Sequence, residues 1–192
     1  MKKILILTAL LCTVGTVLCQ RASFREYGFY GTASYNFSTN LNRKDYVSLF
    51  NGITVTGGFQ IRPKTCIEIG VGFLADKNGT FTQVPITLGL RTHYLNNWIT
   101  PFTDLYAGYS LPLKTTGTTP EGLRMKVDQG GVTVGVNVGA RISMSRKWAI
   151  NAYVGWHFFM VNDLNVYNAD NFPVAKDAWG AHCLKIGLGA MF

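Results

Sequence analysis

The sequence predicts an all-β protein in which eight antiparallel strands close into an up-and-down barrel with a narrow interior. Three observations support this fold class. Apolar residues recur at every second position in eight separate segments, the period of a strand with two unlike faces. The connections between these segments differ in length in a regular order. Beyond residue 19, no helical period of comparable length occurs.

Each of the eight segments carries apolar side chains on one face and mostly Gly, Thr, Ser and Asn on the other. Strands are therefore expected over residues 27–37, 53–62, 66–73, 83–93, 99–111, 132–142, 148–158 and 183–192. Pro85 lies inside the fourth segment. Because proline cannot donate a hydrogen bond to a neighbouring strand, we expect Pro85 at a bulge or at a rim of the barrel.

The connections indicate which ends of the strands lie together. Tight turns are expected at 63–65, 95–97 and 145–147, and long loops at 39–51, 112–129 and 161–178. The third connection, around 76–79, is short although it falls on the side of the long loops. Short turns at one rim and longer loops at the other are typical of barrels that cross a membrane.

Composition favours an apolar surface over a soluble one. Of the 192 residues, 47% are hydrophobic and only 15% are charged, which is low for a water-facing surface. The net charge of +8 is spread over strands and turns without a basic stripe, so we expect no nucleic-acid partner and instead attraction to anionic lipid headgroups.

The first residues have the pattern of a secretory signal peptide. Lys2 and Lys3 precede an apolar run from Ile4 to Leu18, which is too short for a confident transmembrane helix. We expect a signal peptide over 1–19 and one barrel domain over 20–192. A lipoprotein with Cys19 lipidated is the alternative, although the preceding Leu18 is larger than such a site prefers.

The polar face suits a narrow barrel interior better than a soluble coat, since it is rich in glycine and small polar residues. Aromatic residues of the apolar face gather near the strand ends, as the two interfaces of a bilayer require. We therefore predict a transmembrane barrel with its apolar face outward. A secreted soluble barrel or sandwich remains the alternative. The expected aromatic girdle consists of Tyr27, Tyr35, Phe37, Phe73, Tyr109, Trp148 and Phe158.

The last segment ends on Phe192, and Leu184, Ile186 and Leu188 share its spacing of two. This pattern resembles the terminal strand of bacterial outer-membrane β-barrels. The chain from residue 20 resembles the small OmpA/OmpX-type barrels of the outer membrane protein β-barrel domain family, which includes PorT-like proteins of Gram-negative secretion systems. The resemblance implies a Gram-negative outer-membrane location, and recognition of these four residues by the barrel assembly machinery. With an even number of strands, both termini are expected in the periplasm.

The inward face carries several charges, which need partners when they are buried. Glu68, Arg91, Asp104 and Arg141 come from four successive strands and alternate in sign, so we predict an interior ion-pair network from these residues and Lys185. Arg62 is also expected to face inward. Cys66 and Cys183 are expected near opposite rims, as thiols that face the interior rather than as a disulfide.

The sequence carries no recognisable catalytic motif. A resemblance to lipid A deacylases would require a Ser two residues after a His, and His93, His157 and His182 are each followed there by an apolar residue. No metal-ligand spacing or phosphate-binding loop occurs. We therefore predict no enzymatic activity, no cofactor and no metal site.

The predicted function is a structural or surface-interaction role through the long loops 39–51, 112–129 and 161–178, two of which contain apolar residues that suit either a partner or mutual packing over the barrel. Expected partners are outer-membrane lipid, lipopolysaccharide and an extracellular or secretion-system protein. The alternatives are a secretion-system or transport accessory barrel, a lipid-A-modifying enzyme and a small-ion channel.

Overall fold

The computed structural model describes residues 28–41, 49–62, 64–77, 81–95, 97–114, 116–118, 124–167 and 173–192. The expected signal peptide, residues 1–19, and Tyr27 of the expected aromatic girdle lie outside these residues. Within the described part of the chain, no helix is long and apolar enough to cross a membrane.

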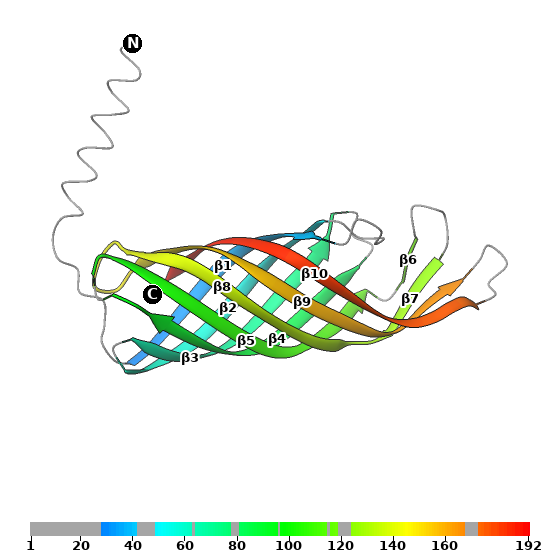
Figure 1. The fold of residues 1–192 in the computed structure, drawn as a ribbon, viewed down its shortest axis with the longest axis horizontal. Coiled ribbons are helices and arrows are strands. Elements are labelled where there is room, and N and C mark those ends of the chain that lie inside the picture. The colour runs from blue at the N-terminus through cyan, green and yellow to red at the C-terminus, as the bar shows by residue number, and fades with distance from the viewer. Residues whose placement is uncertain are drawn as a thin grey trace, which may run out of the picture.

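Eight long strands form a closed antiparallel barrel, which confirms the predicted fold class (Figure 1). They are β1 (Gly28–Asn40), β2 (Leu49–Arg62), β3 (Thr65–Asp76), β4 (Thr82–His93), β5 (Ile99–Lys114), β8 (Gly131–Ser143), β9 (Ala149–Tyr167) and β10 (Pro173–Met191). Each strand pairs with the next around the ring, and β10 pairs with both β9 and β1. The pairing of β1 with β10 closes the barrel and removes the two edges that an open sheet would expose.

The two ends of the barrel differ. The three short connections, β2–β3, β4–β5 and β8–β9, lie at the end where β10 finishes, which we call the turn end (Figure 1). Phe192 joins β1 there, because its N–H donates to Gly31 O at 2.9 Å and Gly31 N–H donates to Phe192 O at 2.8 Å. We call the opposite end the hairpin end.

The long loops predicted at 112–129 and 161–178 are largely strand, which corrects that prediction. Two further strands, β6 (Thr116–Thr118) and β7 (Arg124–Gln129), lie within the first segment, and β9 and β10 extend into the second. Beyond the barrel, β7 pairs with β9 from Asn162 to Tyr167, and β9 pairs with β10 back to Pro173. We use the name arm for β6, β7 and the parts of β9 and β10 that extend beyond the barrel. The arm projects from the hairpin end in Figure 1. The connection predicted at 39–51 is also shorter, because β1 runs to Asn40 and β2 begins at Leu49.

Pro85 lies inside β4 rather than at its rim. Ladder pairs of β3 with β4 occur on either side of it, at Val71–Ile86 and Leu74–Gln83, and are interrupted between. The register shift of β4 against β5 falls nearby, between Thr82 and Gln83. The missing N–H of proline therefore breaks the ladder locally, and the bulge lies two residues earlier.

The apolar face is the outer one, as predicted. Leu88 in β4 is 61% exposed and Leu188 in β10 is 60% exposed, whereas the polar Asn36 and Thr133 are fully buried. Arg62 is an exception to the predicted parity, because it is exposed where β2 ends. An exposed apolar wall around a buried polar interior is the reverse of a water-soluble barrel.

Glycines on the inner face make room for three tyrosines that lie across the interior. Tyr30 is directly opposite Gly58, Tyr106 opposite Gly135 and Tyr153 opposite Gly187. A Cβ added at any of these glycines would collide with the ring of the facing tyrosine. The glycine content of the polar face thus has a packing reason, because only a residue without a side chain leaves space for the neighbouring ring.

Neighbouring glycines in β2 test this packing. Gly58→Ala should lower the free energy of unfolding by about 1–3 kcal/mol, because the new methyl group displaces the Tyr30 ring. Gly57→Ala is the matched control, since nothing lies within 4 Å of its added Cβ. Urea unfolding of the detergent-solubilised barrel checks both variants, and equal stabilities would contradict the packing.

Candidate functional site

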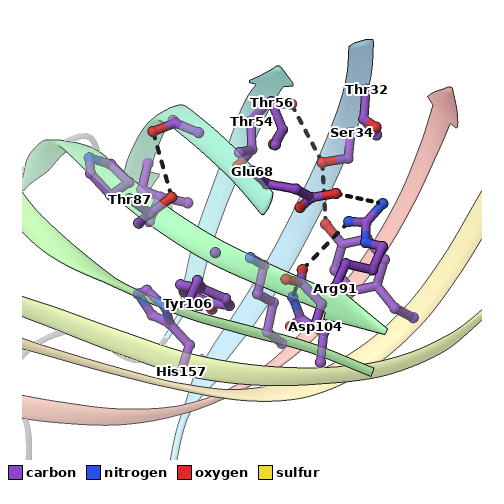
Figure 2. Close-up of a pocket in the computed structure, with 18 of the residues that line it drawn as sticks. Thr32, Ser34, Thr54, Thr56, Glu68, Thr87, Arg91, Asp104, Tyr106 and His157 are labelled. Atoms are coloured by element: carbon purple, nitrogen blue, oxygen red, sulfur yellow. Dashed lines mark hydrogen bonds and ion pairs between the residues drawn. The ribbon is translucent and has the colours of Figure 1, made fainter. Parts of the chain in front are cut away.

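Three buried charges meet inside the barrel. Arg91 Nη1 lies 3.1 Å from Glu68 Oε1, and Arg91 Nη2 lies 3.5 Å from Asp104 Oδ2. All three side chains are at most 9% exposed, and Figure 2 shows the guanidinium between the two carboxylates. The register produces this arrangement, since Arg91 is directly opposite Asp104 and Glu68 is directly opposite Gly89, two residues before Arg91.

Arg141 takes a different place from the one the predicted chain of charges gave it. Its Nη1 lies 3.2 Å from His93 Nε2 and its Nη2 lies 3.5 Å from Thr100 Oγ1. The β8 residue opposite Asp104 is Asn137, whose Nδ2 donates to Asp104 Oδ2 at 3.1 Å. Arg141 is four residues further along β8 toward the turn end, roughly 13 Å along the strand at about 3.3 Å per residue.

Lys185 also faces the interior, where it borders the same cavity as the three charges and lies over two aromatic rings. Its ammonium lies 5.0 Å from the ring centroid of Tyr106 and 5.6 Å from that of Tyr153. A buried ammonium above ring faces is stabilised by the electrons of the rings. Of the five predicted charges, the structure therefore brings together Glu68, Arg91 and Asp104, and places Arg141 and Lys185 beside other groups.

Three interior tyrosines make polar contacts with neighbouring strands, and one of them, Tyr30, contacts the charged group. Tyr30 Oη donates a short hydrogen bond to Glu68, and Tyr153 Oη donates one to Asn36. Tyr106 Oη lies 2.8 Å from His157 Nδ1. Since each tyrosine comes from a different strand, the hydroxyl groups cross-link the interior through polar contacts.

A cavity of about 60 Å³ lies beside the charged group, lined mainly by small polar residues and glycines together with Tyr106 and Lys185 (Figure 2). It has room for only a few water molecules, at about 10–15 Å³ each. Asp104 Oδ1, Asn137 Oδ1 and His157 Nε2 border it and make no hydrogen bond within the described residues. This cavity can therefore hold a few ordered water molecules.

An aromatic plug closes the interior at the hairpin end. We give this name to Phe50, Phe81, Phe159 and Trp179 with the aliphatic residues packed on them, Val127 and Val161. The ring centroids of Phe50 and Phe159 are 5.2 Å apart, those of Phe81 and Phe159 are 6.2 Å apart, and these three side chains are at most 4% exposed.

The short β3–β4 connection places Phe81 in the plug. Asp76 fixes the backbone of Phe81 through two hydrogen bonds. Phe81 N–H donates to Asp76 Oδ1 at 2.8 Å, and Asp76 N–H donates to Phe81 O at 3.0 Å. The sequence shows that this connection is short, but the strand pattern, which begins at residue 83, does not include the inward Phe81. The sequence feature that could have identified Phe81 is its position. It is an aromatic residue just before a strand, and it is spaced by two from the inward residues of that strand.

The turn end is filled by a different set of side chains. Tyr30, Cys66, Ala149 and Met191 form a buried cluster, and Phe102 and His93 lie beside it. Cys66 and Cys183 are both buried thiols at opposite ends, Cys66 in this cluster and Cys183 in contact with the plug, as predicted. The polar cavity therefore lies between two packed layers.

The predicted outer-wall residues lie on the apolar face. Leu184, Ile186 and Leu188 are exposed along β10, and Phe192 packs against Trp148 at the turn end with ring centroids 5.6 Å apart. Tyr35, Phe37, Phe73 and Tyr109 are each at least 41% exposed and lie farther from the turn end. Phe158 is only partly exposed, because Trp156 and His182, which also contact each other, pack against it.

Among the described residues, no group of three or more His, Cys, Asp or Glu side chains is arranged to hold a metal ion. His93 contacts the Cys66 Sγ at 3.8 Å, but its other nitrogen lies against the Arg141 guanidinium. Since an arginine can only donate, this contact makes Nε2 the acceptor and Nδ1 the protonated nitrogen of a neutral imidazole.

Comparison with known proteins supports the fold. No protein-family model and no curated protein sequence matches the chain. Among solved structures, the outer membrane protein OprG from Pseudomonas aeruginosa matches with a TM-score of 0.64 at 14% identity, over 89% of this chain and 99% of that one.

Two other structures give the same result. Neisserial surface protein A matches with a TM-score of 0.60 at 10% identity, over 87% of this chain and 98% of that one. The outer membrane protein AlkL, solved in lipid bilayers, matches with a TM-score of 0.54 at 17% identity, over 89% and 92%. At these identities the comparison establishes a shared fold, that of small outer-membrane β-barrels.

The central arginine gives a direct test of the charged group. Arg91→Ala should lower the free energy of unfolding by about 3–5 kcal/mol, because it leaves two buried carboxylates without their cation. Arg62→Ala, at an exposed position, is the control and should change stability by no more than about 0.5 kcal/mol. An unfolding midpoint of Arg91→Ala equal to that of the control would show that the group does not stabilise the barrel.

Proposed function

We propose that this protein is a non-enzymatic outer-membrane barrel, with the apolar wall in contact with lipid. The observation that carries the proposal is the inverted burial, in which leucine, isoleucine and valine side chains are exposed around the whole ring while charged and amide side chains are buried. The barrel strands have 12 to 19 residues, longer than the 9–11 that cross a bilayer. A closed ring also leaves no strand edge in lipid.

The unequal ends support an orientation with the turn end in the periplasm and the hairpin end outside. Barrels of this type have short periplasmic turns and longer external segments. The arm then projects from the cell surface. The exposed apolar residues of β10, with Phe192, fit the recognition by the assembly machinery that the sequence suggested.

The role we propose is structural support and surface interaction through the arm. The small size of the interior cavity favours this role over solute passage, because it has room for only a few waters between two packed layers. The arm is continuous with the plug, since Val127 of β7 and Trp179 of β10 are among the residues that form the plug. A partner protein or lipopolysaccharide is the binding partner we propose, and an accessory role in a secretion system is the alternative.

Placing a charge on the wall tests whether the wall faces lipid. Leu88→Arg should destabilise the barrel in phospholipid vesicles by about 2–4 kcal/mol, the cost of an arginine near the middle of a bilayer. Met144→Arg, in the exposed β8–β9 turn, is the control and should change little. If Leu88→Arg is equally harmless, the wall faces water and the proposal fails.

Two exposed lysines test the orientation and the surface role together. A photo-reactive amino acid at Lys126 in the arm should form cross-links to surface partners in intact cells, whereas the same amino acid at Lys147 in a turn should not. A membrane-impermeant maleimide should likewise label Lys126→Cys and spare Lys147→Cys. The reverse labelling would invert the orientation. Correct labelling without any arm cross-link to protein or lipopolysaccharide would favour a purely structural role.

A further inference from the structure

A groove of about 260 Å³ opens at the rim of the turn end, apart from the interior cavity. Its lining combines two cations of the β8–β9 turn, Arg146 and Lys147, with three outward aromatic rings, Phe29, Trp148 and Phe192; Gly28, Tyr30 and Gln60 complete it. The aromatic side chains are 52% to 78% exposed, so the groove continues directly into the apolar wall.

The cationic side of the groove is held in place by its own turn. Ser145 Oγ accepts hydrogen bonds from Lys147 N–H at 3.2 Å and from Trp148 N–H at 3.1 Å, and Trp148 O accepts one from Met144 N–H at 2.9 Å. These bonds satisfy the backbone of the turn and fix the bases of Arg146 and Lys147. The guanidinium and ammonium groups are exposed and available to a ligand.

The aromatic side is also fixed. The ring of Phe192 lies over Gly31, where an added Cβ would come within 2.6 Å of it, and it packs against Trp148. Gly28 has a φ of 119°, which favours glycine, and its missing side chain leaves the edge of the groove open. The groove thus has two rigid walls of unlike chemistry.

We propose that this groove binds the headgroup of an anionic phospholipid from the adjacent leaflet. The phosphate would lie between Arg146 and Lys147, and the glycerol and upper acyl chain would lie against Trp148, Phe192 and Phe29. An arginine presents two parallel donors to phosphate oxygens, a lysine adds a second positive charge, and aromatic rings favour the interfacial region of a bilayer. A soluble anion would use the cations but would leave the aromatic wall uncovered. The inference rests on the proposed membrane location.

The barrel offers a matched control at the same rim. Arg62 and Lys64, at the β2–β3 turn, are also exposed cations. They are separated by one residue, and they do not line the groove. R146Q/K147Q and R62Q/K64Q therefore remove the same charge from the same end of the barrel. Only the first pair removes it from the groove.

Native mass spectrometry of the purified full-length barrel tests the proposal. Binding of phosphatidylglycerol and of phosphatidylcholine is measured by titration into detergent micelles, with and without inorganic phosphate as competitor. We expect the barrel to retain one phosphatidylglycerol molecule in preference to phosphatidylcholine. Inorganic phosphate should not displace this lipid. R146Q/K147Q should weaken it about 30-fold, at roughly fivefold for each basic residue near a membrane surface, and R62Q/K64Q less than threefold.

Three outcomes would overturn the proposal. Equal weakening by both double variants would indicate diffuse attraction to the rim. Displacement by inorganic phosphate would indicate a site for free phosphate. Preference for phosphatidylglycerol that appears only after deletion of residues 20–26 would mean that the chain itself covers the groove. Insertion into phosphatidylcholine vesicles, measured in parallel, separates this proposal from the membrane location: a barrel that inserts but shows no lipid preference refutes the groove alone.

Discussion

The pairing of β1 with β10 is the constraint on which the rest of the structure depends. Because this pairing closes the ring, the barrel strands have neighbours on both sides and the wall needs no polar side chains to cover an edge. The wall can therefore be apolar throughout. Closure with eight strands also fixes a narrow interior, and everything inside must fit that width.

The contents of the interior follow from this width. Three tyrosines lie across the barrel, each opposite a glycine, and their hydroxyl groups reach polar partners on other strands. Arg91 between Glu68 and Asp104 places three largely buried charges together, so they depend on one another. The aromatic plug then separates this polar layer from the arm. The interior is thus a packed core of polar groups, and contacts with other molecules are left to the arm, the wall and the rims.

The strands of the barrel were predictable from sequence because each has one face toward an apolar surrounding. That asymmetry produces the period of two. The breaks in the period mark the short turns, and the composition of the two faces indicates which one is outward. The arm was missed for the same reason. Residues 162–167 and 173–179 satisfy their backbone by pairing with each other and with β7, and need no lipid-facing side to do so. An alternation search does not detect strands of that kind.

Register was the second limit. Parity correctly gave Glu68, Arg91, Asp104 and Arg141 an inward direction, but the alternation of one strand does not tell which residue of the next strand lies opposite. In the actual register Asn137 is opposite Asp104. Arg141 is opposite Thr100 instead and lies beside His93. The inward position of Phe81 depends on the Asp76 hydrogen bonds within a short connection, which no periodic pattern reports.

The central claim is that the apolar residues of each strand face lipid and the residues between them face a closed interior. A spin-label scan along Leu105–Leu111 of β5, in a Cys66→Ala, Cys183→Ala background reconstituted in phospholipid vesicles, tests it most directly. Collision with oxygen, which concentrates in lipid, should be frequent at Leu105, Ala107, Tyr109 and Leu111 and rare at Tyr106, Gly108 and Ser110. High accessibility to a water-soluble nickel complex at the first set, or the absence of any alternation, would contradict the account.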